Sequence, residues 1–355
     1  MAGNSIGTVF RVTTWGESHG EALGSIIDGC PAGIPLSETD IQKEVDARKP
    51  RDPSISTNRK EEDKVEILSG VFEGKTTGTP ISLIVHNKDT KSKDYSKFKD
   101  TFRPGHADFT YEIKYGMRDY RGGGRSSGRE TVARVMAGAV AKRVLSSLEG
   151  SKDLLIYGHT IQIGDIFAKS FSKSEIGKNS LKCADKKATK EMLEFIENVH
   201  KEGDSIGAVI EIVVENMPTG LGEPVFDKLD ADLAKAFMSI GAVKGVEFGT
   251  GFDTAFMKGS ENNDQMKTTA KGEIEFLSNS AGGILGGISN GNDIIARLAI
   301  KPVPSISKSQ KTITSKGHNT EISVLGRHDT CLAPRIIPVA ESMAAIVILD
   351  HLLRR

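Results

Sequence analysis

The segment RGGGRSSGRET at residues 121–131 combines residue types that are suited to binding an anion. Three consecutive glycines expose backbone N–H groups and two serines add hydroxyls. An S-x-x-E pattern that begins at Ser127 is typical of a helix start. Helix N-termini attract anions, and Arg121, Arg125 and Arg129 add positive charge, so the segment predicts a phosphate-binding loop. The alternative is a flexible turn with solvated arginines. The segment lacks the GK[ST] and GxGxxG patterns of common nucleotide loops.

Two histidines lie in loop sequences with small neighbours. His19 is part of GESHG at residues 16–20, and His106 is part of RPGHAD. A histidine in such a loop is accessible and titrates near neutral pH, so each is a candidate acid or base. The alternative for each is an ordinary exposed histidine in a turn.

A third candidate is the segment RHDTCLAPR at residues 327–335, where Arg327 and Arg335 flank Asp329. This pattern predicts an anion clamp that contains a carboxylate, and the alternative is a structural salt bridge. Arg48 and Arg51 belong to another basic cluster. Its alternative is a solvated helix end whose positive charge complements the helix dipole.

Composition narrows the class of protein. The chain has 355 residues, with 47 Lys and Arg against 47 Asp and Glu, and this balance argues against a nucleic-acid-binding protein. We find no apolar run of about 18 residues and no secretory signal pattern, which predicts a protein without a membrane span. The three cysteines, Cys30, Cys183 and Cys331, lack metal-binding spacing and fit a reducing compartment. We therefore expect a cytoplasmic enzyme that binds a polyanionic small molecule, with no metal.

The elements that must position these residues alternate between strands and helices. No linker is apparent, so we expect a single domain over 1–355, with the lysine- and glutamate-rich stretch 152–202 at its periphery. Expected strands and loops are a hairpin of 65–73 with 79–86, an exposed loop at 87–101, strands at 207–214, 243–252 and 293–300, and a glycine cluster at 281–287. Expected helices are one capped by Ser37 and ended by Pro50, one over 128–148, one from Leu229 to Ile240 with Gly241 as its C-cap, and a buried one over 338–353.

Taken as a set, these motifs resemble the chorismate synthase family from residue 7 to about 349. The matching blocks are GTVFRVTTWGESHG, FRPGHADFTYEIKYGMRDYRGGGRSSGRET, SIGAVKGVEFGTGF, NSAGGILGGISNG and RHDTCLAPR. The resemblance implies an α+β fold in which helices are sandwiched between antiparallel β-sheets in a single large domain. It also implies a homotetramer.

The activity that the resemblance implies is the conversion of 5-enolpyruvylshikimate 3-phosphate to chorismate and phosphate. This is an anti-1,4-elimination and the last shared step toward aromatic compounds. It requires reduced FMN but has no net redox change, so the cofactor carries the difficult step and the protein supplies placement and electrostatics. NADPH is expected only as an indirect reductant, through an external flavin reductase.

The resemblance also implies roles for single residues. His19 resembles the acid that protonates the departing phosphate, His106 the histidine beside the reduced flavin, and Asp329 the carboxylate that helps remove the ring proton. The residues that match flavin-binding positions are Arg125, Ser126, Ser127, Gly241, Ala242, Gly286, Lys301, Pro302, Val303, Pro304, Ser305 and Arg327. For the substrate or NADP, Arg48 matches an arginine of the family, and Arg51, Arg129 and Arg335 are further candidates.

Three departures from the family pattern bear on these roles. The family often has Asn at the position of Gly241, and both residues tolerate the left-handed geometry of a helix cap. An arginine of the family is replaced by Ser54, and Arg51 is the candidate to substitute for it. The run from Lys301 to Ser305 has fewer hydroxyls than the family pattern.

Two other classes of function compete with this one. A net flavin oxidoreductase using the same loop would consume one reduced equivalent per turnover. A non-catalytic anion- or RNA-binding module would show steep salt dependence and would not need His19, but zero net charge and 6% aromatic residues count against it.

Overall fold

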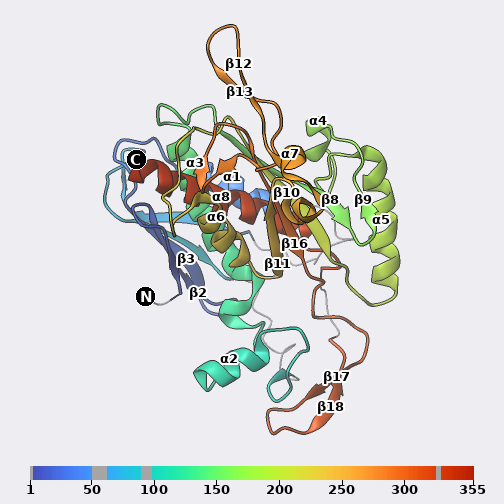
Figure 1. Ribbon diagram of the computed structural model, residues 1–355. Coiled ribbons are helices and arrows are strands. Elements are labelled where there is room, and N and C mark those ends of the chain that lie inside the picture. Colours follow the sequence, from blue (N-terminus) through green and yellow to red (C-terminus); the bar gives the residue numbers. More distant parts are fainter. Residues whose placement is uncertain (1–2, 50–61, 89–97, 325–328) are drawn as a thin grey trace.

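Two five-stranded antiparallel sheets enclose a layer of helices in the computed structural model, which describes residues 3–49, 62–88, 98–324 and 329–355 (Figure 1). The first sheet has the order β1 (Ser5–Ile6), β2 (Arg11–Gly16), β3 (Ala22–Asp28), β7 (Ile81–His86) and β4 (Val65–Ser69). The second has the order β11 (Val243–Phe248), β16 (Ile294–Ile300), β10 (Ala208–Glu215), β8 (Leu155–Ile163) and β9 (Ile166–Phe167).

Each sheet turns one apolar face toward the helices because its strands alternate in burial. In β7, Ile81, Leu83 and Val85 are fully buried. In the second sheet, Ile210 of β10 lies opposite Leu298 of β16, and both are buried. A strand places successive side chains on opposite faces, so this alternation fixes which face of each sheet is covered.

Two long helices form the middle of the sandwich. The first, α3 (Thr131–Leu145), packs on the first sheet together with α1 (Glu38–Ala47), and α8 (Ala333–Arg354) packs on the second sheet together with α6 (Leu229–Met238). The two long helices also pack on each other. A Cβ atom added to Gly138 of α3 would lie 2.6 Å from Cα of Ser342 of α8, so the glycine allows the helices to approach closely.

The central helix α8 is apolar on almost every side. It is the one helix of the described residues that is long and apolar enough, by length and composition only, to cross a membrane. In the fold, 83% of its most apolar window is buried inside the protein. It starts at Ala333, five residues before the predicted start, and continues through Pro338.

Two of the predicted helix ends can be compared with the structure. Ser37 caps α1 in a reciprocal capping box with Asp40, and Ile41 and Val45 are buried as predicted. The predicted end of this helix at Pro50 lies outside the described residues. The prediction of Gly241 as a left-handed C-cap of α6 is wrong: α6 ends at Met238, and Ala242, not Gly241, has a positive φ of 77°.

The predicted hairpin of 65–73 with 79–86 is confirmed, because β4 pairs with β7. A smaller hairpin of β5 (Val71–Phe72) and β6 (Lys75–Thr76) lies between them. Most of the predicted loop at 87–101 lies outside the described residues. The stretch 152–202 is only partly peripheral: β8 is an inner strand of the second sheet, whereas α5 (Lys186–Lys201) lies on the outer side beside β9, with α4 (Lys173–Ile176) (Figure 1).

Several elements project from the sandwich (Figure 1). The helix α2 (Asp108–Tyr115) and the hairpin of β17 (Gln310–Ile313) and β18 (Asn319–Ile322) lie at one end. The hairpin of β12 (Met266–Thr268) and β13 (Ile274–Phe276) projects at the other. The remaining short elements are η4 (Gly251–Phe256), α7 (Gly259–Asn262), β14 (Ile284–Leu285) and β15 (Ile288–Ser289).

Candidate active site

The glycine-rich loop lies directly against both candidate histidines. Gly122 and Gly123 have φ of 68° and 90°, in the left-handed region that favours glycine. A Cβ atom on Gly122 would lie 2.6 Å from Nδ1 of His19, and one on Gly123 would lie 2.8 Å from Cε1 of His106. The three consecutive glycines are thus explained by the approach of two imidazoles to one stretch of backbone.

The helical part of this segment begins with two short 3₁₀ turns, η2 (Gly124–Ser126) and η3 (Gly128–Glu130), which lead into α3. Ser127 accepts a hydrogen bond from the backbone N–H of Arg129 at 3.3 Å. The predicted capping box does not form around it, because the Glu130 carboxylate pairs with Arg134 in the next turn. The helical segment therefore starts where the sequence predicts, but it begins with 3₁₀ turns and has no reciprocal capping box.

His19 is held in a fastened loop after β2. Its side chain lies mostly inside the protein, with the residue 9% exposed, and its Nδ1 lies 3.0 Å from Oγ of Ser18. The amide of Asn87 donates to the carbonyls of Glu17 at 3.0 Å and Gly20 at 2.9 Å, which closes the loop around the histidine. A surface turn without such ties would let the imidazole move, so the fastened loop favours a functional position.

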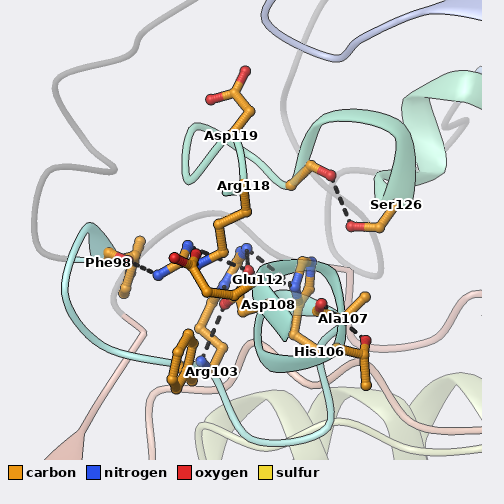
Figure 2. Close-up of polar contacts among 12 residues, drawn as sticks. Phe98, Arg103, His106, Ala107, Asp108, Glu112, Arg118, Asp119 and Ser126 are labelled. Atoms are coloured by element: carbon orange, nitrogen blue, oxygen red, sulfur yellow. Dashed lines mark hydrogen bonds and ion pairs between the residues drawn. The ribbon is translucent and has the colours of Figure 1, made fainter. Parts of the chain in front are cut away.

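His106 is paired with a buried carboxylate. Its Nδ1 lies 2.9 Å from Oδ1 of Asp108, and Arg103 donates to both carboxylate oxygens of Asp108, at 2.7 and 2.9 Å (Figure 2). Burial raises the pKa of Asp108, but hydrogen bonds from Arg103 and His106, with their charges, outweigh it and hold that pKa far below its usual range. Asp108 is therefore an ionised acceptor beside the imidazole.

A cluster of buried arginines lies on the other side of the His19 loop. Arg48 donates to Oγ1 of Thr131 and to the carbonyl of Gly128, both at 2.9 Å, and it is only 5% exposed. Arg129 forms an ion pair with Asp63, and Arg48 lies 3.8 Å from the same carboxylate. Asp63 thus neutralises part of the charge of two buried arginines.

The arginines of this cluster lie close enough to repel one another. Burial, followed by the charge of Arg335, lowers the pKa of Arg48, and the attraction of Asp63 opposes the shift. A lowered arginine pKa means that the cationic form is in an unfavourable environment, which an incoming anion would relieve. The cluster of Arg48, Arg129 and Arg335 therefore fits a phosphate or carboxylate group.

The third predicted segment joins this cluster through its ion pair. Nη1 of Arg335 lies 2.5 Å from Oδ2 of Asp329, so the salt bridge expected as the alternative does form. Arg327 and Arg51 lie outside the described residues. The carbonyl of Thr330 accepts from the N–H of Ile206 at 2.9 Å.

The neighbouring Ser205 donates to the carbonyl of Val303 at 2.7 Å. The run from Lys301 to Ser305, which includes Pro302 and Pro304, therefore passes close to the segment of Asp329. Lys301 connects this run to the His106 loop, because its Nζ donates to the carbonyl of Gly105 at 2.5 Å. Its backbone N–H donates to Ala242 at 2.9 Å, which adds Gly241 and Ala242 to the same region.

The structure separates Gly286 from this group. It lies in the turn between β14 and β15, and the carbonyl of the next residue, Gly287, accepts from the N–H of Leu229 at the start of α6. Gly241 and Ala242 follow the opposite end of the same helix. Since α6 has ten residues, about 15 Å separates its two ends.

Two of the three side chains predicted to bind flavin at the glycine loop, Arg125 and Ser126, also have local partners. The guanidinium of Arg125 donates to Oγ1 of Thr14 at 2.8 Å and to the carbonyl of the same residue at 3.2 Å, which ties the loop to β2. Ser126 donates to the carbonyl of Gly123 at 2.7 Å (Figure 2). Both contacts hold the loop in shape within the chain.

Four residues that sequence reasoning missed are central to this geometry: Ser18, Asp63, Asn87 and Asp108. Ser18 and Asp108 lie inside the motifs GESHG and RPGHAD, so the sequence alone shows that each is a close neighbour of a candidate histidine. Asp63 and Asn87 lie near the ends of strands and in no motif. Their roles depend on contacts with residues far along the chain.

Two histidines held by local contacts, a carboxylate and a buried arginine cluster lie around one glycine loop, an arrangement typical of an enzyme that acts on an anionic substrate. Comparison with known proteins identifies the family. The family model for chorismate synthase matches residues 10–353. A chorismate synthase of Methanosarcina barkeri (strain Fusaro / DSM 804) is 56% identical over 359 residues, covering 100% of this chain and 97% of the relative.

Further similar proteins extend this result. A chorismate synthase of Paramagnetospirillum magneticum (strain ATCC 700264 / AMB-1) is 54% identical over 356 residues, covering 100% of this chain and 98% of the relative. A crystal structure of chorismate synthase has a TM-score of 0.77 and 33% identity, covering 98% of this chain and 93% of that chain. The chain belongs to the chorismate synthase family, and it is a lyase of the shikimate pathway. The expected α+β sandwich of helices between antiparallel sheets is confirmed.

Proposed function

We propose that the protein converts 5-enolpyruvylshikimate 3-phosphate to chorismate and phosphate by anti-1,4-elimination, with reduced FMN and no net redox change. The observation that carries this proposal is the placement of His19 and His106 against adjacent glycines of one loop. That loop continues into the residues of the arginine cluster, so acid–base groups and anion-binding groups belong to one site.

The arginine cluster would bind the anionic groups of the substrate. Arg48 and Arg129 are almost fully buried, and a buried cation that exceeds its local counter-charge gains most from an anionic ligand. Arg335 contacts Asp329 through its Nη1. A bidentate contact with a phosphate or carboxylate suits such groups.

His19 would protonate the departing phosphate. Its imidazole is oriented by Ser18 at Nδ1 and enclosed by the loop that Asn87 fastens, so a proton at this ring is held in one place. General acid catalysis by a positioned histidine contributes at least about 100-fold to a rate. Asp329 would assist removal of the ring proton, from the segment that passes close to Val303.

The residues present fit an anionic flavin. Gly122 and Gly123 bring bare backbone against the rings of His19 and His106, and Lys301 lies beside the His106 loop. Burial, and then the charge of Lys244, lower the pKa of Lys301, so this region would also be favoured by a phosphate. When bound, reduced FMN supplies the electron density that the elimination needs and accepts the ring proton.

We also propose a homotetramer located in the cytoplasm, with NADPH acting only indirectly through a separate flavin reductase. Exposed apolar side chains support assembly with further copies of the chain. On and after α2 these are Phe109, Ile113, Tyr115 and Met117, which are between 49% and 73% exposed. Exposed apolar groups gathered on one projecting element are typical of a subunit interface.

The test is an anaerobic assay with reduced FMN and 5-enolpyruvylshikimate 3-phosphate, in which chorismate and phosphate are measured together. Equal amounts of both, over many turnovers and without flavin oxidation, are expected, and oxidised FMN should give no product. Consumption of one reduced flavin per turnover would instead establish a net oxidoreductase. Binding of anions without any turnover would establish a non-catalytic module.

A further inference from the structure

We propose that Asp108 is a positioning residue for His106: its buried carboxylate fixes the imidazole with a proton on Nδ1, so that Nε2 faces the glycine loop. This inference rests on the proposed function, in which His106 acts beside the flavin. Sequence reasoning assigns no role to Asp108, which is 2% exposed and lies at the first position of α2.

The geometry around Nδ1 carries the first step. Oδ1 of Asp108 lies 2.9 Å from Nδ1 of His106, and Nη2 of Arg103 lies 3.2 Å from the same nitrogen (Figure 2). A guanidinium can only donate, and an ionised carboxylate can only accept. Because the pKa of Asp108 is held far below its usual range, the carboxylate is an acceptor at all ordinary pH values. Nδ1 can take part in only one of the two contacts, by donating to the carboxylate or by accepting from the guanidinium, and we infer that the shorter contact decides, which places the proton on Nδ1.

The second step concerns the opposite edge of the ring. A Cβ atom on Gly123 would lie 3.0 Å from Nε2 of His106, so this nitrogen faces the glycine loop. With the proton on Nδ1, Nε2 of the neutral ring is an acceptor. Free histidine in water favours a proton on Nε2, whereas a carboxylate at Nδ1 reverses this preference. Asp108 therefore decides what His106 presents to the site.

The charged groups around this pair are arranged to hold the carboxylate in place. Arg103 donates to it from the backbone and from two side-chain nitrogens, and Nη1 of Arg118 lies 3.6 Å from Oδ1. Glu112 of the same helix pairs with Arg118 at 3.3 Å (Figure 2). Lys301 contacts the loop at Gly105, the residue before His106. A carboxylate with this many donors cannot rotate away from the imidazole without losing ion pairs.

Asp108 has a purely structural role if Arg103 instead donates to Nδ1, because the imidazole then carries its proton on Nε2. Imidazole ¹⁵N chemical shifts of the ligand-free full-length protein distinguish the two roles without any substrate. We expect His106, assigned by loss of its signals in His106→Gln, to carry its proton on Nδ1 at pH 8. A proton on Nε2 would overturn the proposal, and this readout needs no substitution at Asp108.

Asp108→Asn and Glu112→Gln form the matched pair of variants. In Asp108→Asn we expect a mixture of tautomers, a fall in kcat of about 10-fold or more, and a shift of the pH midpoint of kcat to lower pH, because the imidazolium loses its counter-charge. Glu112→Gln removes a carboxylate from the same cluster that does not touch His106, and its pH midpoint should stay unchanged. An unchanged midpoint in a folded Asp108→Asn would overturn the proposal.

Asp108→Glu keeps the charge and should retain the pH midpoint of the wild type better than Asp108→Asn does. If Asp108→Asn does not fold, the wild-type ¹⁵N measurement decides alone. If the wild type shows the Nδ1 proton but forms no chorismate, the proposed function fails and the positioning role of Asp108 stands.

Discussion

Nε of Arg129 donates to Oδ1 of Asn87 at 3.0 Å, so one amide joins the arginine cluster to the loop that carries His19. The other end of this amide donates to the two carbonyls of that loop. An anion that draws Arg129 toward itself therefore acts on the position of the histidine through a single residue. Under the proposed function, substrate binding at the arginines would therefore be coupled to the placement of His19 through Asn87.

Replacement of Asn87 by alanine should break this connection. We expect turnover of Asn87→Ala to fall about 10-fold or more, since misplacement of a catalytic group by about 1 Å can cost on the order of 100-fold. The control is Asn198→Ala, which removes an exposed amide on the outer helix α5. Steady-state rates measure both variants, and equal rates for wild type and Asn87→Ala would contradict the coupling.

Replacement of Gly122 or Gly123 by alanine should reduce activity strongly, although alanine adds only one methyl group. Each methyl group would meet a histidine within 3 Å, and each residue has a left-handed backbone that costs a non-glycine residue about 1–2 kcal/mol. Gly128→Ala is the matched control, since a Cβ atom there meets nothing within 4 Å. We expect loss of activity in the first two variants and near-normal rates in the third. Normal rates in all three variants would show that this loop does not contribute to catalysis.

Anions should stabilise the folded protein through the arginine cluster. A ligand that binds the folded state only raises the free energy of unfolding by about 2.7 kcal/mol at 100 times its Kd, and we expect inorganic phosphate to act in this way. We expect the Tm to rise with phosphate in the wild type and to rise much less in Arg48→Met, whereas added chloride at the same ionic strength should not replace phosphate. An equal rise in Tm for the wild type and Arg48→Met would show that phosphate binds at another site.

Asp185 should make a pH-dependent contribution to stability. Its two carboxylate oxygens accept from the backbone N–H groups of Lys169, Ser170, Lys187 and Ala188, at 2.9 to 3.0 Å. Hydrogen bonds to this carboxylate, of which the one from Ala188 has the largest effect, lower its pKa, and burial opposes this shift. The pKa of Asp185 is lower in the folded protein than in the unfolded chain, where it is about 4, so its carboxylate stabilises the fold above about pH 4. This contribution is lost progressively as the pH falls further, through the lowered pKa of the folded state.

Asp185→Asn should therefore lower the free energy of unfolding at pH 7 by about 2–4 kcal/mol, because its amide group cannot accept from all four donors. The difference from wild type should shrink as pH falls toward 3. Urea unfolding at several pH values measures this trend. A difference that is constant with pH would show that the charge of Asp185 does not contribute.

The three cysteines should be unreactive in the native protein. All are buried, and burial raises the pKa of the Cys30 thiol to about 11 and that of Cys331 to about 12. A raised thiol pKa lowers the fraction of reactive thiolate at pH 8. Iodoacetamide should therefore modify none of the three until a denaturant is added, and all three afterwards. Rapid native labelling of Cys331 would indicate that the segment of Asp329 opens.

Periodicity and local chemistry predicted many elements correctly. The Ser37 cap, the pairing of β4 with β7 and the long apolar helices all follow from patterns within a few residues of each other. The prediction is wrong at the end of α6: Gly241, the glycine after the apolar run, does not have the left-handed backbone conformation, and Ala242 has it instead. Tertiary contacts decide which residue of a pair takes that conformation, and Lys301 binds the carbonyl of Ala242.

The candidate site was predictable to the extent that its residues lie in motifs. His19, His106 and the glycine loop were found from their neighbours in sequence, and the structure brings them together. Asp63 and Asn87 could not be found in this way, because they meet Arg129 only across about 66 and 42 residues of chain. Their function is a property of the fold and has no signature in the local sequence.

The position of α8 in the chain sets the order in which the protein can be completed. Every strand of both sheets is synthesised before residues 333–354, yet this helix covers the inner faces of β8 and β10. Asp350 of α8 also accepts from the backbone of Thr8, Val9 and Phe10. The part of the second sheet that α8 covers therefore stays exposed on the ribosome until α8 emerges, and exposed apolar surface of this kind makes a nascent chain prone to aggregation.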